Sequence, residues 1–159
     1  MRKLLFIAIL LTSISCKKDS DPTPSNDLTR DLVGSYQYRY SEVYLGNITI
    51  EYTVKWIITK TADNKISLSH RETGQVIPTG PIQHTTEPLE ITFNDIELTR
   101  KDGFTLDRTV DWRLDSREME KVRVVFEGNL VGGKLDVKSK TAIVFRGDVS
   151  EDLVTFTKL

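Results

Sequence analysis

The chain has 159 residues, of which 38% are hydrophobic and 28% are charged, the composition of an ordinary globular protein. Lysine and arginine number 22 against 23 aspartates and glutamates, so the net charge is -1 and there is no basic excess to suit nucleic acid as a partner. Behind a short apolar leader, the remaining length is enough for one domain and excludes two.

The first 15 residues resemble an export signal. Arg2 and Lys3 precede an unbroken apolar run from Leu4 to Leu11. This run is too short to cross a bilayer core of about 30 Å, and a basic start, an apolar run and small residues in that order are typical of signal peptides. We therefore expect residues 1–15 to be a signal peptide.

The residue that follows this leader is Cys16, the only cysteine of the chain. Ser13, Ser15 and Cys16 resemble a bacterial lipobox, although Ser13 stands where the usual pattern has an aliphatic residue. The charged residues 17–19 after the cysteine are similar to those of Bacteroidota lipoproteins. The resemblance implies that Cys16 is the mature N-terminus, that it carries lipid, and that the protein is anchored at the outer membrane or cell surface.

Residues 17–27, KKDSDPTPSND, contain no apolar side chain except two prolines. Such a segment cannot bury surface, so residues 16–27 are expected to be a lipidated cysteine followed by a disordered tether. Asp27 is placed to cap one helical turn over Leu28 to Leu32. Residues 28–159 then form the single domain.

Period-two alternation dominates this domain. From Ile48 to Lys60, apolar and polar residues alternate, so the apolar residues share one face and Ile57 is the only apolar residue on the other. This pattern predicts a strand. Tyr36, Tyr38 and Tyr40 alternate in the same way, and Gly46-Asn47 predicts the tight turn of a hairpin. Turn residues separate further predicted strands: Ile66 to His70, Leu89 to Arg100, Phe104 to Asp115, Lys121 to Val131, Lys134 to Ser139, Ala142 to Arg146 and Leu153 to Thr157.

The stretch from Glu72 to Pro88 is rich in proline and predicts a long loop with one short strand at Gln75 to Ile77. No segment has the apolar stripe of a long helix. The chain is therefore predicted to be all-β, with eight to ten antiparallel strands in a barrel or a sandwich.

The sequence Leu32-Val33-Gly34-Ser35-Tyr36 resembles the start of lipocalin-like domains, in which an aromatic residue plugs the closed end of an eight-stranded up-and-down barrel. Tyr36 stands where lipocalins have tryptophan, and Arg146 is the counterpart of the arginine that packs on it. The resemblance implies a lipocalin-like barrel whose end is closed by Tyr36 and Arg146. An immunoglobulin-like β-sandwich is the alternative.

Few residues suggest catalysis or metal binding. His70 and His84 do not stand in a metal-ligand spacing, and we expect both to be solvated. The sequence has no nucleophile motif and no glycine-rich phosphate loop. We expect a protein that is not an enzyme and that holds no metal or cofactor.

One position breaks the alternation. Phe104, Leu106, Val110 and Trp112 share a face with Arg108, which directs a guanidinium toward the apolar side. Internal pairing or a bulge would explain this. If the barrel is hollow, Arg108 would instead bind the polar end of an amphipathic ligand, while Phe104 and Trp112 line the apolar part.

Two functions follow from these patterns. The first is a membrane-anchored, non-catalytic lipoprotein that binds a small apolar or amphipathic ligand inside a lipocalin-like barrel. The alternative is a cell-surface interaction module without an interior cavity, which binds a glycan or a protein partner.

The anchor can be tested directly at Cys16. Because lipid on this residue would be the only anchor, Cys16→Ala should produce a protein that is extracted without detergent. Membrane fractionation measures this, with Ser15→Ala as a control that keeps the thiol. A Cys16→Ala protein that stays with the membrane after its leader is removed would contradict the anchor.

Overall fold

The computed structural model describes residues 27–44, 48–77, 84–113 and 119–159. This part of the chain contains strands and turns but no helix. The strands are β1 (Gly34–Tyr44), β2 (Ile48–Ala62), β3 (Lys65–Ile77), β4 (His84–Thr85), β5 (Leu89–Glu97), β6 (Gly103–Arg113), β7 (Met119–Val131), β8 (Lys134–Ile143) and β9 (Val149–Lys158).

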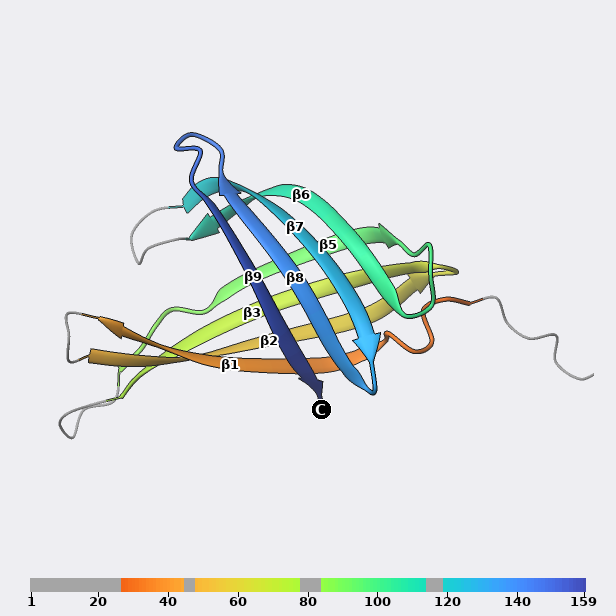
Figure 1. Cartoon of the computed structure of the whole chain (residues 1–159), viewed down its shortest axis with the longest axis horizontal. Helices are drawn as coiled ribbons and strands as arrows, with labels where there is room; N and C mark the ends of the chain where they lie inside the picture. The colour runs from red at the N-terminus through yellow and green to blue at the C-terminus, as the bar shows by residue number, and fades with distance from the viewer. Residues whose placement is uncertain (1–26, 45–47, 78–83, 114–118) are drawn as a thin grey trace, which may run out of the picture.

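The strands form an antiparallel meander that closes on itself (Figure 1). Each long strand pairs with the next along the chain, except that β5 and β6 share no paired residues, and β9 returns to pair with β1. β4 has two residues and pairs only with β3. The fold is thus an all-β, nearly closed barrel of eight long strands, which confirms the lipocalin-like barrel rather than the immunoglobulin-like sandwich.

The barrel is closed along very little of its length. β1 and β9 pair only at Tyr36 with Lys158 and Gln37 with Thr157, with one further bond from the Leu159 amide to the Ser35 carbonyl at 2.9 Å. Beyond this ladder, the β1–β5 half and the β6–β9 half diverge (Figure 1). The molecule therefore has a closed end, near the C-terminus, and an open end.

Trp56 lies at the centre of the core. It is 2% exposed, and its ring centroid is 4.5 Å from that of Phe156 and 5.1 Å from that of Phe126. Its strand follows the predicted alternation, since Ile58 is buried and Ile57 is 49% exposed. The register predicted for this strand is confirmed.

Tyr36 plugs the closed end, as the lipocalin resemblance implies. It is fully buried, and its hydroxyl donates to the Leu32 carbonyl at 2.8 Å. The turn that carries Leu32 begins at Asp27, whose carboxylate accepts from the Thr29 amide at 3.0 Å. The Nζ of Lys158 lies 5.5 Å from the centre of the Tyr36 ring.

The predicted partner of Tyr36, Arg146, lies elsewhere, and this prediction is wrong. Two strands were expected between residues 134 and 146, but β8 is one continuous strand that ends at Ile143. Residue 146 therefore lies in the turn that follows, at the open end. Its exposed guanidinium pairs with Glu120 at 2.6 Å. Lys158, which ends β9 opposite Tyr36, supplies the cation instead.

Glycines serve two purposes at the β7 end of the barrel. Gly132 and Gly133 have φ of 56° and 79° and make the β7–β8 turn, where residues with side chains would be strained. Gly128 lies directly beneath Phe104, where a Cβ would come within 2.4 Å of the ring.

Other differences from the expected strands are small: residues 75–77 continue β3, and the predicted turn at 46–47 lies outside the described residues.

The core position of Trp56 predicts a large loss of stability on truncation. Trp56→Ala should lower the free energy of unfolding by about 3 to 5 kcal/mol, because it leaves a cavity between three aromatic rings. Ile57→Ala is the matched control, since its side chain faces outward and should cost less than about 1 kcal/mol. Urea unfolding of both variants measures this, and equal midpoints for the two would contradict the register.

Candidate functional site

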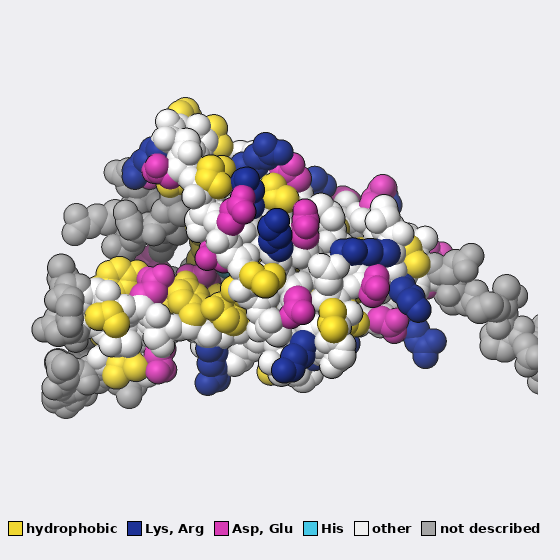
Figure 2. Space-filling model, in the orientation of Figure 1, with side chains coloured by type: hydrophobic (Ala, Val, Ile, Leu, Met, Phe, Trp, Pro, Cys, Tyr) yellow, Lys and Arg dark blue, Asp and Glu magenta, His cyan; other side chains and the backbone are white. Residues whose placement is uncertain are grey.

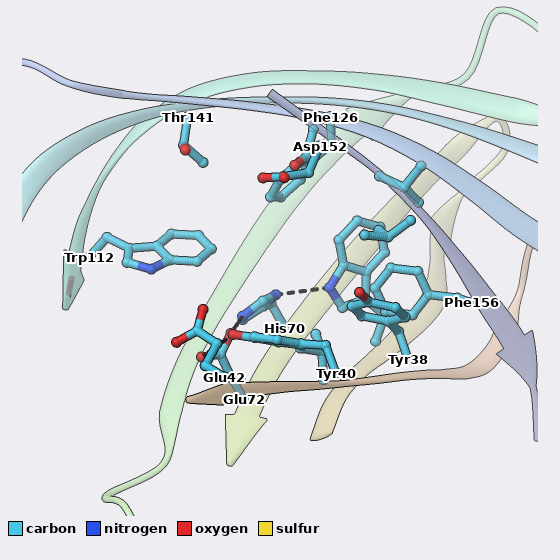
Figure 3. Close-up of a pocket in the computed structure, with 15 residues that line it drawn as sticks. Tyr38, Tyr40, Glu42, His70, Glu72, Trp112, Phe126, Thr141, Asp152 and Phe156 are labelled. Atoms are coloured by element: carbon cyan, nitrogen blue, oxygen red, sulfur yellow. Dashed lines mark hydrogen bonds and ion pairs between the residues drawn. The ribbon is translucent and has the colours of Figure 1, made fainter. Parts of the chain in front are cut away.

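A cavity of about 320 Å³ lies between the two halves of the barrel at its open end. Figure 2 shows the surface hollowed between the halves, and Figure 3 shows the side chains around the hollow. The size is at the lower end of the about 300–1,000 Å³ typical of small-molecule pockets. The cavity is lined by Tyr38, Tyr40, Glu42, Val54, Trp56, His70, Glu72, Trp112, Phe126, Val137, Ser139, Thr141, Asp152, Val154 and Phe156.

The cavity has an apolar floor and a polar mouth, because inward positions of four strands carry polar side chains toward the open end. Strand geometry sends every second side chain inward, so each change takes place over two residues. In order from floor to mouth the pairs are Tyr40 and Glu42 in β1, His70 and Glu72 in β3, Val137 and Ser139 in β8, and Val154 and Asp152 in β9. The polar residues are therefore neighbours across the barrel although they are far apart in sequence.

His70 is the most unusual residue of the lining. It is 4% exposed, so the expectation of a solvated histidine is wrong. Its Nδ1 accepts a hydrogen bond from the Trp56 Nε1 at 2.8 Å, and this places the ring proton of the neutral imidazole on Nε2. Nε2 lies 3.9 Å from the Glu72 carboxylate and has no hydrogen-bond partner within the described part of the chain.

The protonation states of this pair follow from burial. Burial lowers the pKa of His70 to about 4, so the imidazole is neutral at physiological pH. Burial also raises the pKa of Glu72 above its usual value, even though the Tyr40 hydroxyl donates to its Oε1 at 3.4 Å. The cavity thus offers one buried N–H donor beside a partly desolvated carboxyl group.

Aromatic rings make up the walls. Tyr40 stacks on Tyr38 at 5.7 Å and on Tyr52 at 4.8 Å between ring centroids. Trp112 approaches the His70 ring at 5.0 Å from the other half of the barrel. Flat apolar surfaces therefore surround the polar groups at the mouth.

Of the predicted ligand-binding residues, Trp112 is in the cavity and Phe104 is not. Phe104 is 2% exposed and packs 6.2 Å from Trp56 in the core beneath. Arg108 also lies outside the lining: it is exposed, and its guanidinium donates to the Asp107 carbonyl at 2.9 Å. The prediction that Arg108 faces the cavity is wrong.

The position of β6 explains the placement of Arg108. The register sets Arg108 opposite the buried Val124, as the alternation predicts. β6 is however an edge strand without paired residues on its β5 side. Its side chain is therefore able to reach water there, and neither a bulge nor internal pairing is needed.

Other classes of site find little support in the part of the chain that the structure describes. No group of three His, Cys, Asp or Glu side chains there is arranged to hold a metal ion. The same residues form no helix of the length and apolarity that a membrane span requires. The side chain of His84 and the predicted anchor Cys16 lie outside the described residues.

Comparison with known proteins identifies no relative, because no family model, curated protein or solved structure matches the chain. The function of the domain is therefore inferred from the cavity itself.

The environment of His70 predicts an unusual titration. Its ring signals in NMR should stay unchanged from neutral pH down to about pH 5 and titrate near pH 4, because protonation would bury a charge. His84→Ala identifies the signal. In the unfolded chain a histidine binds its proton near pH 6.5, so His70 lowers the free energy of unfolding as the pH falls from about 6.5 to 4. Glu72 has a raised pKa in the folded protein, so its protonation raises the free energy of unfolding as the pH falls. A His70 midpoint near 6.5 would contradict the buried site.

Proposed function

We propose that the domain binds a small amphipathic ligand in the cavity between its two halves and does not transform it. The observation that carries the proposal is the unpartnered Nε2 of His70, whose side chain is 5% exposed and borders an open aromatic cavity. A buried donor without a partner costs about 1–3 kcal/mol. A ligand oxygen would satisfy it while the aromatic walls cover the apolar part of the ligand.

We further propose that the domain is delivered as a lipoprotein, anchored through Cys16 at the outer membrane or cell surface as in Bacteroidota. The support is the leader and lipobox-like sequence of residues 1–16. The first described residues are at the closed end, where Lys60 pairs with Asp27 at 2.6 Å. A tether that enters there leaves the mouth of the cavity unobstructed.

The alternative is a surface module that binds a glycan or protein partner. It has one observation in its favour, the exposed apolar side chains of the β8–β9 hairpin and β9, with Phe145 85% and Leu153 77% exposed. The cavity counts against this alternative, since the module was expected to have a filled interior.

Ligand binding can be measured through the protein's own fluorescence. The chain has two tryptophans, and both Trp56 and Trp112 line the cavity. We expect at least one of three probes with the same apolar part, 4-phenylbutan-1-ol, 4-phenylbutylamine and 4-phenylbutanoate, to change this fluorescence saturably. Native mass spectrometry gives the stoichiometry, which should be one.

Two phenylalanine variants of β8 locate the binding. Ser139→Phe fills the cavity and should abolish the saturable change, whereas Lys138→Phe adds the same ring on the exposed face and should leave it intact. Equal binding by the two variants, or no binding of any probe by the unmodified protein, would reject the proposed function.

A further inference from the structure

The carboxylates of the cavity differ from those on the outside of the barrel. Figure 2 shows charges of both signs interspersed over the surface. Many outward carboxylates lie within 4 Å of a lysine or arginine nitrogen: Asp27, Asp63, Glu90, Glu97, Asp107, Asp111 and Glu151. The acidic residues of the cavity, Glu42, Glu72 and Asp152, form no such pair in the described part of the chain.

These acids surround one space from different strands. Figure 3 shows Glu42 and Glu72 on the wall made by β1 and β3, and Asp152 on the opposite wall. Their hydrogen bonds come from neutral groups: the hydroxyl of Tyr44 to Glu42, that of Tyr40 to Glu72, and that of Ser150 to Asp152. Among the residues that the structure describes, no lysine or arginine lines the cavity.

The described residues of the lining therefore give the cavity a negative charge. His70, the remaining titratable base of the lining, is neutral because its pKa is lowered to about 4. Low-dielectric walls concentrate the field of such charges inside a cleft. A cation at the mouth would be attracted by carboxylates from both halves, while an anion would be repelled.

The aromatic walls suit the same kind of ligand. Tyr40 and Trp112 line the same cavity as the carboxylates, and the Trp112 ring centroid lies 5.0 Å from that of His70. The face of an aromatic ring attracts ammonium groups, by roughly 0.5–2 kcal/mol depending on desolvation. Carboxylates combined with aromatic faces thus favour an organic ammonium over a hydrated metal ion.

From this geometry we propose that the ligand is a small organic cation, an amine or quaternary ammonium compound that also carries an oxygen acceptor. Its ammonium group lies among Glu42, Glu72 and Asp152, its apolar part packs on the aromatic rings, and its oxygen accepts from the Nε2 of His70. This proposal rests on the proposed function, because it specifies the ligand of the same cavity.

The need for an oxygen acceptor on the ligand is inferred from His70 alone. Its Nε2 is a donor, because Nδ1 is held as an acceptor by Trp56. An ammonium group has no lone pair to offer, so it cannot satisfy this donor. A hydroxyl or carbonyl oxygen near the ammonium group satisfies both sides of the site.

The three matched probes separate charge from shape. We expect 4-phenylbutylamine to bind about tenfold or more tightly than 4-phenylbutan-1-ol, a difference of about 1.4 kcal/mol, and 4-phenylbutanoate to bind most weakly. The preference for the amine should shrink as salt is added, because exposed parts of the site are screened. If the alcohol or the acid binds as tightly as the amine, the cationic ligand is rejected while the proposed function stands. If no probe binds, both are rejected.

Neighbouring acids on β9 provide the matched variants. Asp152→Asn removes an inward charge and should weaken amine binding about tenfold with little effect on the alcohol, whereas Glu151→Gln removes an outward charge that is paired with Lys140 and should have no effect. Glu72→Gln should act like Asp152→Asn. Equal losses for Asp152→Asn and Glu151→Gln would overturn the role of the cavity charges.

The acceptor is tested with 2-amino-1-phenylethanol and 2-phenylethylamine, which differ by one hydroxyl group. The hydroxyl compound should bind more tightly and should shift the His70 ring signals in NMR more strongly. Identical affinities together with identical His70 shifts would reject the contact with Nε2.

Discussion

The short ladder between β1 and β9 is the constraint on which the shape of this protein depends. The paired residues that join the first strand to the last are two pairs at one end, with one further backbone bond from Leu159 to Ser35. There the inner faces are held together, and they pack around Trp56 and Tyr36. Since no ladder holds the halves at the other end, the twist of each half carries them apart, and a cavity of about 320 Å³ remains between them. Core and cavity are consequences of the same incomplete closure.

One hydrogen bond links these two regions. Trp56 is buried among the rings of Phe126 and Phe156, and this packing fixes the direction of its indole N–H. The N–H donates to His70 and so determines which nitrogen of the imidazole faces the cavity as a donor. The apolar core thereby sets the hydrogen-bonding character of the site, without a charged residue beneath it.

Much of the fold could be predicted from the sequence, because alternation in strands such as β2 is a local signal. The positions of Trp56 and Ile57 and the all-β class followed from it. The role of Arg146 could not be predicted, since it depends on where β8 ends, and the sequence between residues 134 and 146 allowed one strand or two. Arg108 was assigned to the correct face, but alternation does not report that β6 is an edge strand from which a long side chain reaches water.

Most of the cavity escaped prediction for a related reason. Glu42, Glu72 and Asp152 continue the inward series of their strands, yet acidic residues near strand ends are usually solvated. Nothing in one strand indicates that other strands contribute polar residues to the same cavity. His70 escaped for the same reason. The signal was nevertheless present, because each of these residues lies two positions from an inward apolar or aromatic residue. If the alternation of each strand is continued beyond its apolar residues, the next inward positions are these carboxylates.

The position of the first described residues has a consequence for how the cavity is filled. Asp27 is fastened at the closed end by Lys60, and the Leu28 amide donates to Asn64 in the adjacent β2–β3 turn at 2.9 Å. An anchor upstream of this point would be joined to the end of the barrel opposite the mouth. Attachment and opening would then lie at different ends of the molecule, so the anchor would not block exchange of molecules between the cavity and the surrounding water.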